Sequence, residues 1–355
     1  MKLGLRSGVA AAILSFSSIA AGGITSAAHA EGPKVVATLK PIHSLVASVM
    51  QGVGEPTLIV EGASSPHGFS LKPSQMAAVQ DADMVFWVGP MMETFLVKPL
   101  ENVDPSHAVE LAELPGMRLM NYDEDHDHDH EHEHDHDHAD GDGHDHDADH
   151  DHEHEHEEDH ADHDADHDHE MAEGEEHHHH HSGVDGHLWL DPENAIAIAD
   201  GVADALSTVD PDNAVLYKAN AAKLRADLSA QSEQIAATLA PVAGRGFIVF
   251  HDAYQYFESR YGLDAAGSVT VNPEVSPSAA HIAEMQDRIR DSGAVCVFSE
   301  PQFPAKMVDV VTEGMSLNRA VLDPLGATLE PGPALYGDLI GALADSFARC
   351  LGSGS

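Results

Sequence analysis

The segment KVVATLKPIHSLVASVM, residues 34–50, contains the pattern from which the architecture of the whole chain can be inferred. Residues 34–39 form a short run rich in apolar side chains, which is typical of a strand buried on both faces. Residues 41–50 begin with proline and place apolar side chains at helical spacing, so they predict a helix. A buried strand followed directly by a helix is the repeating unit of a parallel sheet with right-handed crossovers.

The same alternation of strand and helix recurs in both halves of the chain. In the first half it predicts further strands at 57–60, 84–88 and 108–111 and helices at 73–79 and 92–100. In the second half it predicts strands at 247–250, 267–270, 295–299 and 320–322 and helices at 253–261, 278–290, 305–315 and 335–350. We therefore expect an α/β fold with two Rossmann-like lobes, each built on a parallel sheet.

Two helical segments connect the halves. Residues 192–206 and 212–239 both show helical periodicity, and the second segment is unusually long. At 1.5 Å per residue, roughly 28 residues extend about 40 Å, which is enough to cross two domains. We therefore expect a long rigid helix that joins the two lobes.

The first 30 residues have the composition of a secretory signal. Lys2 and Arg6 precede an apolar run at 9–24, and the small residues Ala28 and Ala30 lie where a signal peptidase cuts. The apolar run is too short and too rich in Gly and Ser to favour a membrane span. We expect cleavage after Ala30 and a mature protein that is free in the periplasm.

A segment dominated by His, Asp and Glu occupies residues 122–186, as in DEDHDHDHEHEHDHDH at 123–138. It has almost no apolar side chains, so burial cannot offset an ordering cost of about 1 to 2 kcal/mol per residue. We expect a disordered loop that binds metal weakly, because histidine and neighbouring carboxylates are metal ligands. It would act as an accessory zinc collector or as a sensor of zinc abundance. A solvated acidic linker without a metal role is the alternative.

The expected organisation follows from these boundaries. It comprises a signal peptide at 1–30, an N-terminal α/β lobe at 31–121, the histidine-rich loop at 122–186, the end of the N-terminal lobe at 187–210, the linking helix at 211–241 and the C-terminal α/β lobe at 242–355.

The charge of the folded part is also strongly negative. Residues 123–176 contain 28 of the 61 acidic residues and none of the 17 basic residues. Without that segment and the two basic signal residues, 33 acidic and 15 basic residues remain, a net charge of −18. This balance argues against nucleic acid as a partner, since binding phosphates requires clustered Lys and Arg. It favours attraction of small cations.

The chain contains two cysteines, Cys296 and Cys350. In an exported protein two cysteines most simply form one disulfide, and closing a loop of this length stabilises by about 4 kcal/mol. Two buried thiols are the alternative. A thiolate metal site is weakly supported, because neither cysteine lies in a CxxC pair.

Four potential metal ligands lie where loops can reach the edge of a sheet. His67 comes after the strand at 57–60, His251 directly follows FIVF, Asp323 directly follows AVL, and His187 follows the histidine-rich segment. In open parallel sheets, ligands bind outside the carboxyl ends of the strands. Three imidazole nitrogens and one carboxylate oxygen form a four-coordinate set that matches zinc in softness and geometry. We expect these four residues to bind metal in the cleft between the lobes.

Other polar residues are weaker candidates for a role at the metal site. Glu61 and Asp252 lie next to the proposed ligands and are candidates for fixing a histidine tautomer or for an alternative oxygen ligand. His43 and His281 are interpreted as ordinary capping or solvated helix positions, and His107 has no clear role.

The segments around these residues resemble those of a known family. PHGFSLKPSQ, GHLWLDPENA, FHDAYQYF, EPQF and LDPLG are similar to signature segments of the periplasmic zinc-binding components of ABC importers, the ZnuA-like members of the cluster A-I solute-binding proteins. The resemblance extends from about residue 34 to residue 351, and the motifs occur in family order.

The resemblance implies two α/β lobes bridged by one rigid helix, a metal held between them by His67, His187 and His251, and delivery to a membrane permease. It also implies a disulfide between Cys296 and Cys350. Manganese-binding relatives typically carry a carboxylate at the position of His251, so the histidine favours zinc. Some zinc members have Glu where this chain has Pro66, which leaves Asp323 or a water molecule as the fourth ligand.

These features predict a monomeric periplasmic protein that captures zinc with high affinity and delivers it to the permease of an ABC importer, without enzymatic activity. The alternatives are a free zinc buffer or chaperone and a manganese-binding relative. A zinc hydrolase also uses three histidines and water, but it requires an open coordination position and a general base.

Overall fold

The computed structural model describes residues 32–122, 183–270, 273 and 278–353 of the chain. The predicted signal peptide lies outside the described residues, as do residues 123–182 of the histidine-rich segment. Within the described ranges, no helix has the length and apolar character needed to cross a membrane.

The N-terminal lobe is built on a parallel four-stranded sheet. Its strands are β1 (Val35–Ala37), β2 (Thr57–Leu58), β3 (Met84–Trp87) and β4 (Ala108–Glu110), in the order β2-β1-β3-β4. Every residue of β1 and β3 is buried, as their continuous apolar sequences require. The helices of this lobe are α1 (Lys40–Val49), α2 (Pro73–Gln80) and α3 (Thr94–Leu100), with single 3-10 turns at Pro105–His107 and Leu111–Glu113.

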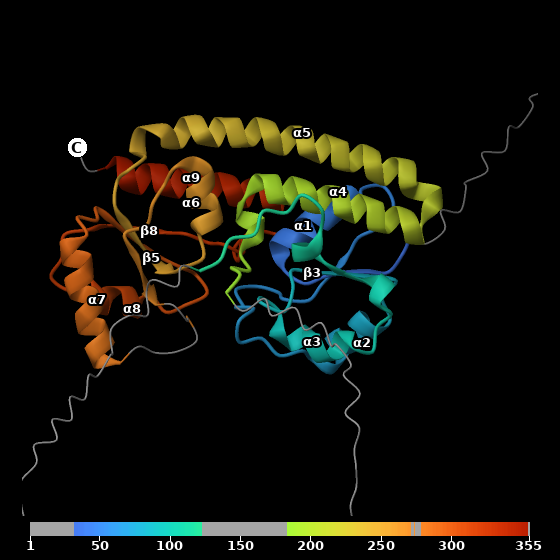
Figure 1. Cartoon of the computed structure of the whole chain (residues 1–355), viewed down its shortest axis with the longest axis horizontal. Coiled ribbons are helices and arrows are strands. Elements are labelled where there is room, and N and C mark those ends of the chain that lie inside the picture. The colour runs from blue at the N-terminus through green and yellow to red at the C-terminus, as the bar shows by residue number, and fades with distance from the viewer. Residues whose placement is uncertain (1–31, 123–182, 271–272, 274–277, 354–355) are drawn as a thin grey trace, which may run out of the picture.

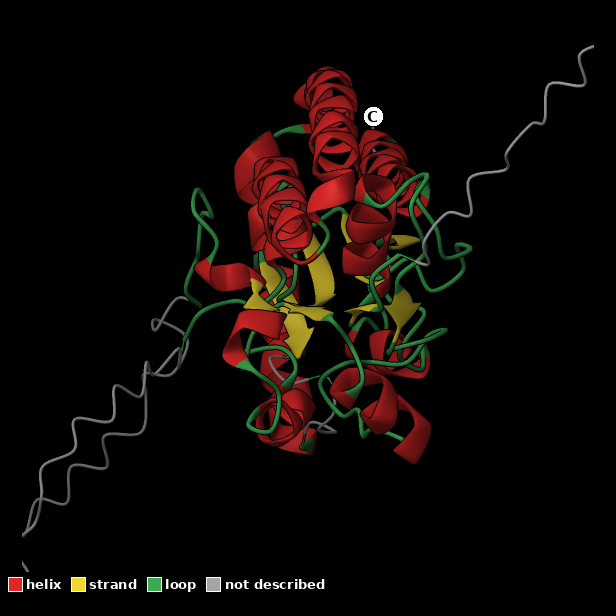
Figure 2. Ribbon diagram, turned by 90° about the vertical axis from the view of Figure 1, so that its right-hand side faces the viewer, coloured by secondary structure: helices red, strands yellow, loops and turns green. Residues whose placement is uncertain are grey.

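The C-terminal lobe repeats this topology. Its strands are β5 (Phe247–His251), β6 (Gly267–Thr270), β7 (Cys296–Ser299) and β8 (Asn318–Val321), all parallel and in the order β6-β5-β7-β8. Its helices are α6 (Gln255–Tyr261), α7 (Ala279–Asp291), α8 (Lys306–Val311) and α9 (Leu335–Gly352). The predicted α/β fold with two parallel sheets is therefore confirmed, and Figure 2 shows the strands between helices above and below them.

Side chains alternate across the second sheet. Phe247 and Val249 of β5 belong to the main hydrophobic core, which extends into the N-terminal lobe. Ile248 and Phe250 face the other way and belong to a smaller core that includes Met285 of α7. This period of two is the geometry of a strand buried on both faces.

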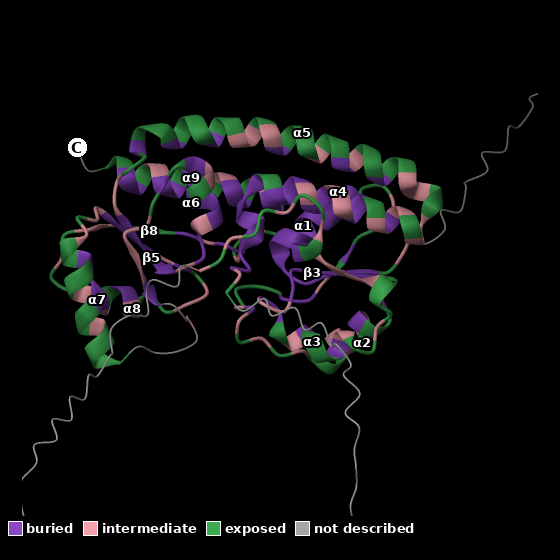
Figure 3. Ribbon diagram, viewed as in Figure 1, coloured by how far each residue is buried: buried purple, intermediate pink, exposed green. Residues whose placement is uncertain are grey.

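Two long helices cross above the sheets. α4 (Pro192–Val209) follows the 3-10 turn η4 (Leu188–Leu190), and α5 (Ala214–Leu239) lies between the 3-10 turns Pro211–Asn213 and Ala240–Val242. Figure 1 shows α5 extending over both lobes at the top of the view, and Figure 3 shows that its outer face is exposed. The Asn220 amide donates to the carbonyls of Val49 and Gln51 in the N-terminal lobe, and the Gln231 amide donates to Gly337 of α9. The helix is therefore attached to both lobes.

The two lobes also contact each other directly. Lys40, at the start of α1, is buried, and its ammonium group donates to the carbonyls of Gly326, Ala327 and Leu329 in the loop after β8. The Ser44 hydroxyl accepts from the backbone N–H of Tyr336 at 2.9 Å. These bonds hold the C-terminal loop 322–334 against the N-terminal lobe.

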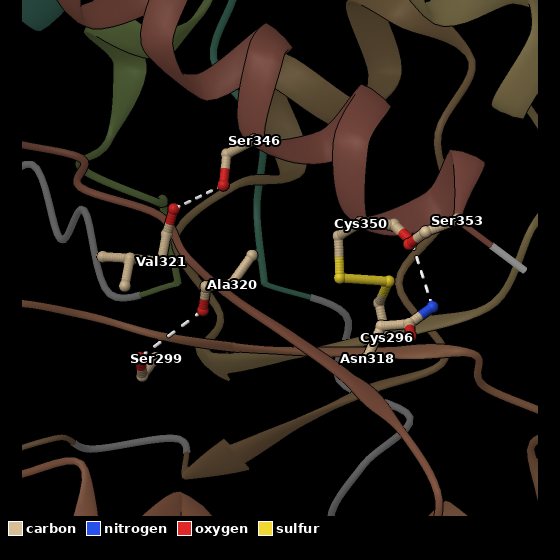
Figure 4. Close-up of a disulfide and its surroundings, with 8 residues drawn as sticks. All are labelled: Cys296, Ser299, Asn318, Ala320, Val321, Ser346, Cys350 and Ser353. Atoms are coloured by element: carbon tan, nitrogen blue, oxygen red, sulfur yellow. Dashed lines mark hydrogen bonds between the residues drawn. A yellow bond between two sulfur atoms is a disulfide. The ribbon is translucent and has the colours of Figure 1, made fainter.

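A disulfide joins Cys296, the first residue of β7, to Cys350 near the end of α9. Figure 4 shows it beside Asn318, whose amide donates to the carbonyl of Cys350 at 3.3 Å. The predicted disulfide is confirmed, and the alternative of two buried thiols is wrong.

Two local expectations need correction. His43 is neither a capping nor a solvated residue, because its ring is buried and its Nε2 lies 3.0 Å from the carbonyl oxygen of Pro56. The helix predicted at 305–315 ends at Val311. Gly314 adopts a φ of +75° in the turn that follows, a left-handed conformation that stops helical continuation.

Candidate metal centre

Three histidines from distant parts of the chain converge between the lobes. His67 lies in the loop after β2, His187 directly precedes η4, and His251 is the last residue of β5. One ring nitrogen from each lies within 4.8 Å of the others, and they are the group of potential metal ligands found among the described residues. The structure therefore brings together three of the four residues predicted as ligands.

The burial of the three rings differs. His187 and His251 are 3% and 4% exposed, whereas His67 is half-buried. His251 lies at the carboxyl end of an internal strand, where parallel sheets present ligand-binding groups. His67 reaches the other two from the N-terminal lobe, with ring centroids at 5.4 Å from His187 and 5.8 Å from His251.

Buried carboxylates orient the two deeper rings. The Nδ1 of His187 lies 2.7 Å from Asp185 Oδ1, and the Nδ1 of His251 lies 2.8 Å from Glu300 Oε1. A carboxylate can only accept, so it keeps the proton of each neutral ring on Nδ1 and leaves Nε2 with its lone pair. Outer carboxylates of this kind typically orient metal-binding histidines.

The spacing of the free nitrogens matches a tetrahedral zinc ion. The Nε2 atoms of His187 and His251 lie 3.3 Å apart. Zinc–nitrogen bonds of about 2.0 to 2.1 Å at a tetrahedral angle place two ligand nitrogens about 3.3 to 3.4 Å apart. With the proton of each neutral ring on Nδ1, neither Nε2 can donate to the other, and a cation bound by both nitrogens offsets the repulsion between their lone pairs.

The protonation of the histidines follows from their surroundings. Burial, with smaller contributions from His187 and His251, lowers the pKa of His67 to about 3. Burial on its own lowers the pKa of His251, but the charge of Glu300 and the hydrogen bond to it raise that pKa above its usual value overall. At neutral pH the His67 ring is therefore unprotonated and available as a ligand.

The walls around the rings are mostly apolar. The cavity has a volume of about 10 Å³. Besides the three histidines it is lined by Ser65, Pro66, Trp189, Glu300, Gln302, Phe303, Pro324 and Leu325. Such a space accommodates an ion and little solvent, and a dry site strengthens the bond between a cation and its ligands.

Asp323, the fourth predicted ligand, is not brought into this group. Its Oδ1 accepts from the Gln302 amide at 2.8 Å and from the backbone N–H of Leu325 at 3.2 Å. Its Oδ2 accepts from the N–H of Ala327 at 2.6 Å. These three bonds hold the turn after β8, so the carboxylate organises the loop that forms one wall of the cavity.

Sequence reasoning missed the two carboxylates that bind the histidine rings. The Nδ1 groups of His187 and His251 donate to Asp185 and Glu300, whereas Glu61 and Asp252 are the residues predicted for that role. Asp185 lies two residues before His187 in VDGH, and Glu300 directly follows β7, the neighbour of β5. The position of Glu300 after an adjacent strand is a signal that could have identified it.

The ends of the histidine-rich segment meet beside this centre. Asn121 and Val184 form an antiparallel bridge, and the Tyr122 hydroxyl donates to Asp185 Oδ1 at 3.0 Å. Burial and the charge of Asp185 raise the pKa of Tyr122, so its hydroxyl remains a donor. The Asp185 carboxylate, which orients His187, thus also accepts a hydrogen bond from Tyr122, the last described residue before position 123.

Comparison of the sequence with known proteins gives consistent matches. A family model described as zinc-uptake complex component A, periplasmic (ZnuA), matches residues 35–350. The high-affinity zinc uptake system protein ZnuA of Brucella abortus (strain 2308) is 47% identical over 336 residues, which cover 94% of this chain and 96% of the relative. The protein of the same name from Paracoccus denitrificans is 40% identical over 328 residues, covering 92% and 94%.

Comparison of the structure gives the same fold. A crystal structure of ZnuA matches with a TM-score of 0.66 at 20% identity, covering 90% of this chain and 99% of that chain. A Zn(II)-bound variant of AdcAII from Streptococcus pneumoniae matches with a TM-score of 0.63 at 20% identity, covering 89% and 99%. Both comparisons support the two-lobed α/β architecture.

Proposed function

Since the chain belongs to the ZnuA family of periplasmic zinc-uptake components, we propose that it captures zinc with high affinity and delivers it to the permease of an ABC importer. The observation that supports this function is the three-histidine cluster. In it, two buried carboxylates accept from the Nδ1 groups of His187 and His251, and the Nε2 atoms of these two rings lie 3.3 Å apart. In this role the protein binds and releases an ion and catalyses no reaction.

We propose His67, His187 and His251 as the protein ligands of the zinc ion. Three neutral nitrogen donors favour zinc over manganese, which prefers carboxylate and other oxygen ligands. Asp323 is left out of the ligand set because its two oxygens accept three hydrogen bonds within the C-terminal lobe.

Zinc titration of the metal-free protein tests this proposal. The protein is expected to bind one zinc ion tightly, and His67→Ala is expected to weaken that site by more than the roughly 10- to 100-fold typical of losing an outer hydrogen-bond partner. His281→Ala, on the exposed surface of α7, is the matched control and should leave the affinity unchanged. Equal affinity in the His67 variant and the control would remove His67 from the site.

The rival functions differ in what they require. A hydrolase needs room for a substrate beside the metal, and a cavity of about 10 Å³ does not favour it. A free zinc buffer or chaperone needs no permease. Growth of a deletion strain in chelated medium separates the proposed importer component from a zinc buffer. Loss of import starves the cell of zinc, whereas loss of a buffer is expected to leave growth intact.

We further propose that the histidine-rich segment is an accessory zinc collector. Its composition supports this role, and its ends meet beside Asp185. Deleting residues 123–182 is expected to lower the total number of zinc ions bound while one tight site remains. An unchanged total would contradict the accessory role and leave the tight site unaffected.

The remaining proposals concern organisation. We propose cleavage after Ala30, a monomer in the periplasm and no nucleic-acid partner. We also propose that residues 31–121 and 187–210 form the N-terminal lobe, that residues 211–241 form the linking helix, and that residues 242–355 form the C-terminal lobe. Mass spectrometry of the exported protein and its elution volume on gel filtration test the first two.

A further inference from the structure

Gln302 lines the cavity beside the three histidines, and its amide is held in one orientation. Its Nε2 donates to Asp323 Oδ1 at 2.8 Å. Because a carboxylate only accepts, the NH₂ group of Gln302 must be the end that faces Asp323. Asp323 is itself fixed by the backbone N–H groups of Leu325 and Ala327. The carbonyl end of the Gln302 amide is therefore directed away from Asp323.

The oxygen at that end is buried and has no hydrogen-bond partner. Among the residues that line the cavity, Gln302 Oε1 and Glu300 Oε2 are the buried oxygens without a hydrogen-bond partner, and Glu300 already accepts from the His251 ring through its other oxygen. Most buried polar atoms in folded proteins are paired, and an exception calls for an explanation such as a ligand or a bound solvent molecule. An unpaired acceptor in the wall of a metal cavity indicates that a donor is present when the site is loaded.

The proposed ligand set has a place for such a donor. Three histidine nitrogens leave a tetrahedral zinc ion one ligand short. Asp323 does not supply the fourth ligand, because its oxygens face Gln302 and the backbone of its own turn. A water molecule on zinc is a strong hydrogen-bond donor, because the metal withdraws electron density from its oxygen.

We propose that Gln302 is a positioning residue whose Oε1 accepts a hydrogen bond from a water molecule that completes the coordination of the zinc ion. The inference rests on the proposed function of His67, His187 and His251 as ligands. A neutral amide holds the water without adding negative charge to the site. The fourth ligand is then a small neutral molecule that can be replaced, which suits a protein that must also release its ion.

Two variants at this position and one control test the inference. Gln302→Leu keeps roughly the size of the side chain and removes both the acceptor and the donor to Asp323. The double variant Gln302→Glu with Asp323→Asn keeps a hydrogen bond between the two positions, because the Asn amide can donate to the carboxylate, and it keeps an acceptor in the cavity wall. Gln286→Leu is the matched control, because the Gln286 amide donates to the carbonyl of Val310 between α7 and α8, outside the cavity. Melting of each metal-free variant establishes that it is folded.

Affinity and spectroscopy provide the readouts. Competition with a chromophoric chelator is expected to show zinc binding about 10- to 100-fold weaker in Gln302→Leu, restored in the double variant and unchanged in the control. The visible absorption bands of the cobalt(II) form report the fourth ligand directly. They should shift in Gln302→Leu and stay in place in Gln286→Leu, which a purely structural role for Gln302 would not produce.

A crystal structure of the zinc-loaded protein gives the decisive observation, including the case in which Gln302→Leu does not fold. The expected result is one solvent oxygen on zinc within hydrogen-bond distance of Gln302 Oε1. A protein atom in the fourth position, Gln302 Oε1 itself included, overturns the inference, as do unchanged affinity and unchanged cobalt bands in folded Gln302→Leu. If titration of the unmodified protein shows no tight zinc site, the proposed function fails as well. If the tight site is present and only the Gln302 variants leave it unchanged, the function stands and the inference about Gln302 fails.

Discussion

Glu300 shows how one side chain outside the proposed ligand set can orient a histidine that we propose as a zinc ligand. It is 3% exposed, and its Oε1 lies 2.8 Å from the Nδ1 of His251. Beside it lies the buried hydroxyl of Tyr254, whose pKa is raised well above its usual value, first by burial and then by the charge of Glu300. The His251 ring is thus held against a carboxyl group that is itself buried.

Glu300→Gln is expected to weaken zinc binding at the tight site by about 10-fold. The amide oxygen can still accept the Nδ1 proton, but the neutral group makes the His251 ring a weaker base and a weaker ligand. Competition titration measures the change. Glu233→Gln on the exposed surface of α5 is the control, and a loss of the same size there would contradict a specific role for Glu300.

Glu258 of α6 is a buried carboxyl group, and no basic side chain in the described part of the chain forms an ion pair with it. Burial raises its pKa to about 7, although the hydrogen bond from the backbone N–H of Ala265 acts in the opposite direction. The unfolded chain loses this proton near pH 4.5. The folded state thus binds more protons between these values, so its stability falls as pH rises from about 4.5 to about 7.

Glu258→Gln is expected to remove this pH dependence. Compared with the unmodified protein, the variant should gain stability at pH 8, on the order of 3 kcal/mol, and should gain little near pH 4. Thermal melting of the metal-free protein from pH 4 to pH 8 measures the difference. Glu101→Gln, at the exposed end of α3, should show no such trend.

At the scale of the elements, the disulfide and the metal centre lie at opposite ends of β7. Cys296 begins this strand, and Glu300 directly follows its last residue, Ser299. The crosslink to Cys350 attaches α9 to the sheet at the end away from the histidines. We therefore expect the crosslink to contribute to stability, whereas the opposite end of the strand lies at the proposed zinc site.

Replacing both Cys296 and Cys350 with alanine is expected to lower the free energy of unfolding by about 4 kcal/mol, because the crosslink closes a loop of 54 residues. Urea unfolding of the metal-free protein measures this loss. Zinc affinity at the tight site should stay the same, and a large drop in affinity would show that the strand transmits the change to Glu300.

At the scale of the whole molecule, the lobes are held together independently of any ion. α5 is bonded to both lobes through Asn220 and Gln231, and the buried Lys40 ammonium binds three carbonyls across the interface. Burial lowers the pKa of Lys40, while the charges of Asp323 and Glu330 oppose that shift. These hydrogen bonds restrain the position of one lobe relative to the other.

Lys40→Met is expected to destabilise the metal-free protein by about 3 kcal/mol or more, because the apolar stem is kept while three buried carbonyls lose a charged donor. Chemical unfolding measures the loss, and Lys306→Met at the exposed start of α8 is the control. A loss no larger than that of the control would show that the interface does not depend on Lys40.

Local sequence was sufficient for the architecture and for three converging histidines. Apolar runs such as 84–88 and 247–250 form strands that are buried on both faces when helices cover the sheet. Polar residues that follow parallel strands lie at the same edge of the sheet. This reasoning located His67, His187 and His251.

Only the folded structure settled the partners of those residues. Glu300 lies 49 positions from His251, and the choice among Asp252, Glu61 and Glu300 depends on how loops from different strands meet. Asp323 follows a strand as a ligand would, but its oxygens face the backbone of its own turn. Secondary structure depends on neighbours in sequence, whereas a hydrogen bond between distant side chains depends on directions that exist only after the lobes have packed.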